Sequence, residues 1–292
     1  MKNLQPQKIL HFLKRHWIHI GMSFVYFYLN CILLYRFWNA PIGFTIIIYA
    51  LSMAIALSPI GEWIFRKIKN VRDLYTYKEK EYLMPIFDEV FIEVEKKHSK
   101  VNQKIGIYII DEMTINAFAI GWHTIAVTQG AIDTLSREQL KGLIAHEFGH
   151  ILHGDTIINM IIYLGSGIFT ILSLWISISM YWIRKLSEMF DRSKVISLFV
   201  NILMFIAGIL MIFCTFILQT GLAINSRVHE FKADMFAHEI GFGAELISAF
   251  YILQKTALQG NDSIAKKLQA SHPHIARRIG RLEKVQGIEY TG

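Results

Sequence analysis

The chain has 292 residues and a net charge of +7, and 53% of its residues are apolar whereas only 18% are charged. Because a typical soluble domain is about 25% charged, this composition excludes an ordinary soluble protein and an intrinsically disordered one. Four uncharged stretches of at least 20 residues each stand out: His16–Tyr35, Phe37–Gly61, Thr156–Ile183 and Val195–Ser226. Since roughly 20 apolar residues span a bilayer as a helix, we expect four membrane spans and one soluble domain.

The expected spans pair into two hairpins that interrupt the soluble part of the chain. The predicted order is a basic cytoplasmic tail (1–15), a two-span hairpin (16–61), a soluble segment (62–155), a second two-span hairpin (156–226) and a second soluble segment (227–292). Basic residues flank the first hairpin on both sides: Lys2, Lys8, Lys14, Arg15, then Arg66, Lys67, Lys69 and Arg72. Such flanks stay on the cytoplasmic side, so we expect both soluble segments to face the cytoplasm. The membrane that we expect the protein to span is the cytoplasmic membrane of a bacterium.

Two further observations concern the charge distribution. The connection over residues 184–194 is also basic, which leaves open the alternative that the third and fourth spans do not fully cross. The basic residues lie beside spans and are not interleaved with aromatic residues, so the charge does not indicate nucleic-acid binding. No GxxxxGK[ST] motif occurs, and the sequence therefore predicts no nucleotide as a partner.

The first soluble segment begins with a helical pattern, continues with strands and ends in a second helix. Apolar residues recur every three or four positions over Leu74–His98, which predicts a helix. Three short β-branched stretches with turns between them predict strands at Ile105–Ile110, Ile115–Ile120 and Thr124–Thr128. Ser136 and Gln139 form a capping box ahead of an apolar-periodic run, which predicts a helix over Arg137–His153 that ends at Gly154.

This second helix carries a pattern typical of zinc hydrolases. His146 and His150 are four residues apart, so both imidazoles project from one face and can bind one Zn²⁺. Glu147 is the expected general base. His153 is a weaker alternative ligand, since one helix rarely supplies three tetrahedral ligands. Asp155 is expected to orient a ligating imidazole, the alternative being a solvated acid at the helix end.

A zinc peptidase needs a third protein ligand, which we expect after the fourth span. Glu230 and Asp234 are four residues apart and share one helical face. We predict that Glu230 is the third ligand and that Asp234 accepts a hydrogen bond from a ligating imidazole, which fixes its tautomer. The rival third ligand is His229, although it points about 100° away from Glu230 on a helix.

These motifs together resemble the HtpX-type membrane zinc endopeptidases, which are gluzincins related to the CAAX prenyl endopeptidases. The similarity runs from about Leu74 to Leu282 and is carried by Asn116–Ala119, Val127–Gly130, Ala145–His150, Ser226–Asp234 and Ser271–Pro273. The resemblance implies an α-helical multi-pass membrane protein with an α+β zincin-like metalloprotease domain, built on a small three-stranded sheet and an active-site helix. It also implies one Zn²⁺ per chain, with His146, His150 and Glu230 as ligands and Glu147 as the base.

The resemblance implies three further site features. Asn116, Ala117 and Phe118 would lie on an edge strand that pairs with extended substrate, the alternative being an Asn that bonds its own backbone. His272 would donate to the tetrahedral oxyanion, the alternative being a His at the start of a helix. Arg278 would act in catalysis beside the acids of the site.

The sequence therefore predicts a zinc metalloendopeptidase that hydrolyses peptide bonds. The resemblance implies a role in the quality control of damaged or misfolded membrane proteins. The expected partners are protein or peptide substrates, membrane proteins among them, and the lipid bilayer. Two alternatives stay open, namely an inactive zinc-containing membrane scaffold and a CAAX-type prenyl peptide protease.

Overall fold

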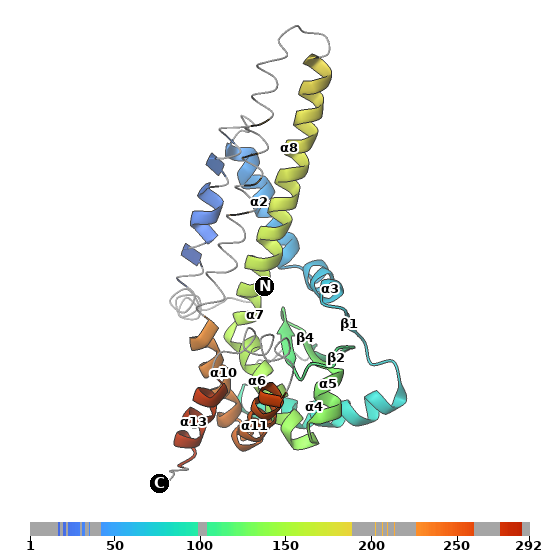
Figure 1. Cartoon of the computed structure of the whole chain (residues 1–292), viewed down its shortest axis with the longest axis vertical. Coiled ribbons are helices and arrows are strands. Elements are labelled where there is room, and N and C mark those ends of the chain that lie inside the picture. Colours follow the sequence, from blue (N-terminus) through green and yellow to red (C-terminus); the bar gives the residue numbers. More distant parts are fainter. Residues whose placement is uncertain are drawn as a thin grey trace. The chain divides into compact units, whose positions relative to one another are not determined.

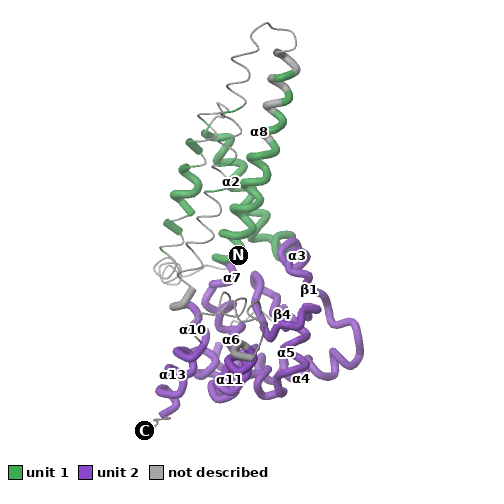
Figure 2. The backbone as a smooth tube through the Cα atoms, in the orientation of Figure 1, with its two compact units in different colours: residues 1–62, 158–224 green, residues 63–157, 225–292 purple. Residues whose placement is uncertain are grey.

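The computed structural model describes residues 42–98, 104–188, 226–259 and 275–287, together with residues 17, 20, 21, 23–29, 31, 32, 35, 202, 206, 209 and 213. The chain divides into two compact units (Figure 2). We call Met1–Glu62 with Ile158–Ile224 the helical unit, and Trp63–Ile157 with Asn225–Gly292 the α+β unit.

The described part of the helical unit consists of packed helices. Helix α2 (Ile42–Ala56) packs against the π-helical turn η1 (Met160–Gly165) and against α8 (Ser166–Glu188). Gly165 permits this contact, because a Cβ at this position would lie 2.7 Å from the Met53 side chain. The Tyr26 hydroxyl lies 2.6 Å from Thr170 Oγ1, which satisfies two polar groups inside an apolar bundle.

The structure describes the four predicted membrane spans to different extents. The helix Asp155–Trp175 is long and apolar enough to cross a membrane, and α2 together with α3 (Pro59–Ile68), bent by 74° at their break, passes the same test as a pair. Of the predicted span His16–Tyr35 the structure describes residues 17, 20, 21, 23–29, 31, 32 and 35, all helical, and of Val195–Ser226 only residues 202, 206, 209, 213 and 226. The four-span topology therefore stays a prediction.

The α+β unit contains a small mixed sheet. Its strands are β1 (Val71–Arg72), β2 (Gly106–Ile110), β3 (Ala117–Ile120) and β4 (Thr124–Thr128), in the order β1-β2-β4-β3. Strands β2 and β4 are parallel, and the other two pairs are antiparallel. The prediction of three strands was wrong by one, because the two-residue strand β1 is too short to show an alternating pattern. Strand β3 lies at one edge of the sheet.

Capping residues decide where the helices of this unit begin. Helix α4 (Tyr77–Lys97) starts three residues later than predicted, because Thr76 and Glu79 form a capping box there. Helix α6 has the predicted bounds, Arg137–His153, with the predicted capping box, and Gly154 ends it in a left-handed conformation with φ 78°. The remaining helices are α5 (Gln129–Thr134), α7 (Asp155–Asn159), α10 (Ser226–Glu239), α11 (Gly243–Gln259) and α13 (Ile275–Val285).

Helix α6 is the centre of the α+β unit. It packs against α4, α10 and α11, which surround it in Figure 1, and against strand β3. Phe148 is fully buried, with its ring centroid 5.4 Å from that of Phe87 and 5.9 Å from that of Phe91. On another face of the helix, Gly142 and Gly149 let the backbones of α11 and α10 approach closely. The helix that carries the predicted zinc motif is therefore held on all sides, which is how a site is kept rigid.

Candidate metal centre

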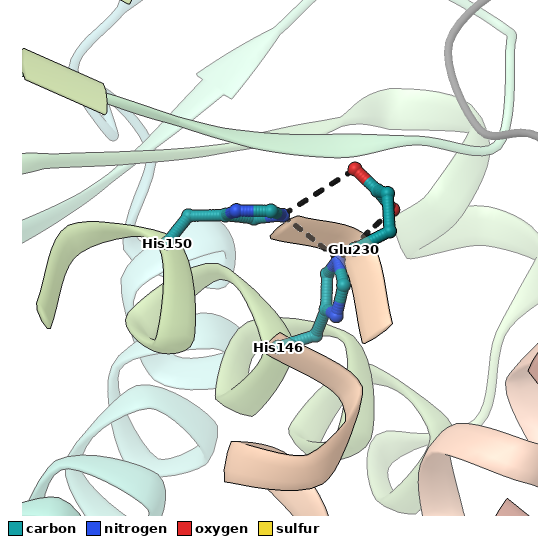
Figure 3. A group of neighbouring side chains, drawn as sticks. All are labelled: His146, His150 and Glu230. Carbon is teal, nitrogen blue, oxygen red and sulfur yellow. Dashed lines mark hydrogen bonds and ion pairs between the residues drawn. The ribbon is translucent and has the colours of Figure 1, made fainter. Parts of the chain in front are cut away.

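Three side chains from two helices converge on one point in the α+β unit (Figure 3). His146 and His150 come from α6 and Glu230 comes from α10. The two imidazole Nε2 atoms lie 3.1 Å apart, and each lies 3.6 Å from a carboxylate oxygen of Glu230. His146 is fully buried and Glu230 is only 7% exposed. The structure thus brings together the three residues that the sequence predicted as ligands.

The spacing of these atoms suits a tetrahedral zinc ion. Zinc bonds to nitrogen and oxygen ligands are about 2.0–2.2 Å long, which separates the ligand atoms of a tetrahedron by about 3.3–3.6 Å. The two nitrogens lie 3.1 Å apart, and the 3.6 Å distances run from His146 to Oε2 and from His150 to Oε1 of Glu230. With one ligand atom from each residue, the three atoms lie within 4.8 Å of one another, so a small shift of the Glu230 carboxylate brings one oxygen to a tetrahedral spacing. Two imidazoles and one glutamate are also a donor set of catalytic zinc sites, which leave the fourth position to water or substrate.

Each imidazole of the cluster is held by a carboxylate through its other nitrogen. His146 Nδ1 lies 2.9 Å from Asp234 Oδ1, and His150 Nδ1 lies 3.0 Å from Asp155 Oδ2. An acceptor at Nδ1 places the imidazole proton there, and the lone pair of Nε2 then points into the cluster. Both acids that the sequence predicted as partners of the imidazoles take this position.

Arg278 borders the cluster from α13. Its guanidinium donates to both oxygens of Asp234, at 2.8 and 2.6 Å, and lies 2.8 Å from Glu230 Oε2. Its Nη2 also lies 3.2 Å from His146 Nε2, and its Cζ lies 4.2 Å from the centre of the Phe250 ring. A guanidinium that is 1% exposed needs such bidentate partners. Arg278 therefore ties α13 to α10 at the acids of the site.

The charges around the cluster favour a cation. Four acidic side chains are buried at or beside it, namely Glu147, Asp155, Glu230 and Asp234, and Arg278 compensates one of them. Burial and the Arg278 charge lower the pKa of His146, but hydrogen bonds to Asp234 and Glu230 outweigh them and raise it to about 9. The same acids would attract a divalent metal ion, because buried charges require partners.

Comparison with known proteins identifies the family. The sequence pattern of Peptidase family M48 matches residues 78–286. The chain belongs to this family. An M48 protein is a metalloprotease, so the enzyme class predicted from the sequence and its resemblance to HtpX-type proteases are both confirmed.

Individual relatives are distant in sequence. The "Protease HtpX homolog" of Methanocaldococcus jannaschii is 28% identical over 271 residues, covering 81% of this chain and 91% of the relative. The "Protease HtpX homolog" of Helicobacter acinonychis is 32% identical over 142 residues, covering 47% of this chain and 42% of the relative. Among solved structures, S. mikatae Ste24p aligns with a TM-score of 0.46 at 18% identity, covering 91% of this chain and 63% of that one.

Glu147 of this M48 protease follows His146 directly on α6. Its side chain is 2% exposed, and no described residue forms a hydrogen bond or ion pair with its carboxylate. It is close enough to His150 and Arg278 to influence their protonation. A carboxylate in this position can accept a proton from a water molecule at the cluster.

The predicted substrate-binding residues lie at the sheet edge formed by β3. Asn116 precedes the strand, and its side-chain oxygen accepts a hydrogen bond from the Ala117 N–H at 3.0 Å. This is the alternative left open from the sequence, an Asn that bonds its own backbone. Ala117 is buried and Phe118 is half-buried. The edge position of β3 is compatible with pairing to an extended peptide, and the role of these residues stays a prediction.

Two further histidines in the described part of the M48 domain, His229 and His153, lie outside the metal cluster. His229 does not join Glu230 there, because its Nδ1 lies 2.5 Å from Asp155 Oδ1. The His153 ring lies 6.1 Å from the Phe236 ring, centre to centre, and is not part of the metal cluster either. His272, the predicted oxyanion donor, lies outside the described residues. Sequence reasoning missed the contact of His229 with Asp155, because these residues are 74 positions apart.

Proposed function

We propose that this metalloprotease is a membrane-embedded zinc endopeptidase, with His146, His150 and Glu230 as ligands of one zinc ion and Glu147 as general base. The observation that carries the proposal is the spacing of the three ligand atoms, together with the carboxylate at each imidazole Nδ1. When bound, a zinc ion in such a donor set polarises the scissile carbonyl and lowers the pKa of water toward ~7.

The residues around the cluster have distinct roles in this proposal. Glu147 accepts the proton of the attacking water and passes it to the leaving amine, which is supported by its burial beside His146 on α6 and by its electrostatic influence on His150. Arg278 holds Glu230 and Asp234 in place and keeps a positive charge beside the reacting atoms. His272 stays the predicted donor to the oxyanion.

The substrate of this activity would be an extended peptide segment. Edge strand β3 supports this view, because a peptide can add to a free edge by main-chain hydrogen bonds while alternate side chains enter pockets. Such recognition requires local unfolding and not a particular sequence. It is therefore consistent with damaged or misfolded membrane proteins as substrates, in a bacterial cytoplasmic membrane with the catalytic unit in the cytoplasm.

Glu147→Gln tests the proposed chemistry. Wild type and variant, purified as the full chain in detergent, are compared for zinc content and for cleavage of an unfolded protein such as casein. We expect one zinc ion per chain in both proteins and cleavage by wild type alone. Glu138→Gln is a matched control, since Glu138 lies exposed on the same helix and its loss should leave cleavage unchanged.

Each other outcome of this comparison favours an alternative. Full activity of Glu147→Gln contradicts the role of Glu147, and zinc binding without cleavage by wild type favours an inactive scaffold. Cleavage that is restricted to prenylated C-terminal peptides favours a CAAX-type protease. New protein termini that occur in membranes of cells with wild type, but not in those with Glu147→Gln, would identify the physiological substrates.

The proposed topology has its own test. If the third and fourth spans cross completely, a cysteine introduced at Ser187 reacts with a membrane-impermeant reagent added to intact cells. If it reacts only after lysis, the connection between these spans lies inside the cell and the spans do not fully cross.

A further inference from the structure

The two imidazoles of the metal cluster are supported in parallel ways. Each donates through Nδ1 to a carboxylate, and a second buried donor holds that carboxylate. For His146 the chain of contacts continues through Asp234 to Arg278, which the family resemblance already implied as a site residue. For His150 it continues through Asp155 to His229, and the proposed function assigns no role to that histidine.

The contact between His229 and Asp155 is short and buried. His229 Nδ1 lies 2.5 Å from Asp155 Oδ1, while the other oxygen, Oδ2, lies 3.0 Å from His150 Nδ1. His229 and Asp155 are each 7% exposed. The plane of an aspartate carboxylate rotates easily about its last torsion. Because His229 contacts Oδ1 and His150 contacts Oδ2, the carboxylate plane of Asp155 is fixed. The direction of the hydrogen bond between Asp155 and His150 is fixed as a result.

The position of His229 on α10 links two supports of the site. His229 precedes Glu230 directly, so the two side chains leave the helix about 100° apart. Glu230 reaches the cluster and His229 reaches Asp155 at the start of α7. Helix α10 therefore places Glu230, the third predicted ligand. It also places His229, which holds Asp155, the acid that orients His150.

We propose that His229 is a positioning residue for the metal ligand His150 and acts on it through Asp155. The inference rests on the proposed function, because it requires that His150 binds the metal. A neutral imidazole with its proton on Nδ1 is sufficient for the contact. Outer partners of metal-ligating histidines typically contribute 10–100-fold to metal affinity, and we expect an effect of this size.

The test measures zinc affinity by chelator competition, in the full-length chain in detergent that carries Glu147→Gln to prevent self-digestion. His229→Leu removes the donor and should weaken zinc binding about 10–100-fold. His229→Asn keeps an N–H near the position of Nδ1 and should stay within threefold of the parent. His238→Leu, which removes a half-buried imidazole from the same helix outside the cluster, should have no effect.

Two further measurements separate positioning from a general loss of structure. The visible absorption of bound Co²⁺ should change in His229→Leu and return to that of the parent in His229→Asn. If His229 acts through Asp155, then His229→Leu should cause no further loss of affinity in an Asp155→Asn background, since the two changes break one chain of contacts. If His229→Leu does not fold, His229→Gln takes its place, since its longer side chain carries the N–H away from the position of Nδ1. A loss of zinc affinity relative to His229→Asn then supports the role of His229, and equal affinities refute it.

The outcomes distinguish this inference from the proposed function. If the parent binds no zinc, or if His150→Ala leaves its affinity unchanged, the proposed site is wrong. If His150→Ala abolishes binding but His229→Leu costs less than fivefold, only the role of His229 is refuted. Equal losses in His229→Asn and His229→Leu, or additive losses with Asp155→Asn, would also refute it.

Discussion

Replacing Gly149 by alanine tests whether the close packing of α6 and α10 assembles the metal site. A Cβ at position 149 would lie 2.9 Å from Cα, 3.1 Å from Cβ and 3.2 Å from the carbonyl oxygen of Ala233. Since carbon atoms in contact are about 3.5–4.0 Å apart, α10 would have to withdraw by about 0.5–1 Å. Ala233 lies one turn after Glu230 on this helix, so Glu230 would withdraw with it.

A displacement of this size exceeds what a metal site tolerates. Ligand distances are held to within about 0.2 Å, so Gly149→Ala should weaken zinc binding at least as much as the loss of an outer partner, about 10–100-fold. Overpacking at a rigid contact also costs about 1–3 kcal/mol of folding free energy. For a unit of this size, that loss lowers the melting temperature by about 2–12 °C.

Chelator competition and thermal unfolding of the metal-free chain measure the two effects. Gly280→Ala is the matched control, because no atom lies within 4 Å of its added Cβ. Gly280 is exposed on α13, and alanine there should stabilise the helix by about 1 kcal/mol. Zinc affinity of Gly149→Ala equal to that of wild type would refute the reasoning, since α10 would then not depend on this contact.

Three further predictions concern charges and the metal. Asp234→Ala removes the bidentate partner of the buried Arg278 and the acceptor of His146 Nδ1, while Arg278 keeps its ion pair with Glu230, so denaturant unfolding should show a loss of about 1–3 kcal/mol. The hydrogen bond from Arg72 lowers the pKa of Glu79 from 4.5 to about 2. The folded-state value is the lower one, so this contact stabilises the fold above pH 4.5 and its contribution disappears as the pH falls toward 2. The free energy of unfolding of Glu79→Gln should therefore change less with pH between about pH 2 and 4.5 than that of wild type. Equal slopes in the two proteins would contradict a stabilising contact between Glu79 and Arg72. A zinc chelator should abolish cleavage and lower the melting temperature, because ligand at 100 times its Kd adds about 2.7 kcal/mol, whereas unchanged melting would argue against a resident metal.

Local features of the site could be predicted from the sequence because they depend on neighbouring residues. The bounds of α6 follow from the capping box at Ser136 and from Gly154, and both are as predicted. The pairing of His146 with His150, and of Glu230 with Asp234, follows from helical periodicity alone. The start of α4 was missed by three residues, although Thr76 and Glu79 carry the capping pattern that sets it.

Contacts between distant segments were decided only by the tertiary structure. Strand β1 exists because Val71 and Arg72 meet Ile110 and Ile109 of β2, and two residues have no periodicity to reveal this. No pattern along the chain brings Arg278 against His146, 132 positions earlier.

The sequence by itself predicted which stretches are apolar enough to cross a membrane, and the motif His146 to His150 by itself predicted which helix carries two residues of the candidate metal cluster. Which acid holds which imidazole was decided by packing. His229 looked like a rival ligand because its side chain is of the right type and lies next to Glu230. The structure turns it toward Asp155, because adjacent helical residues point about 100° apart and only one of them can face the metal cluster.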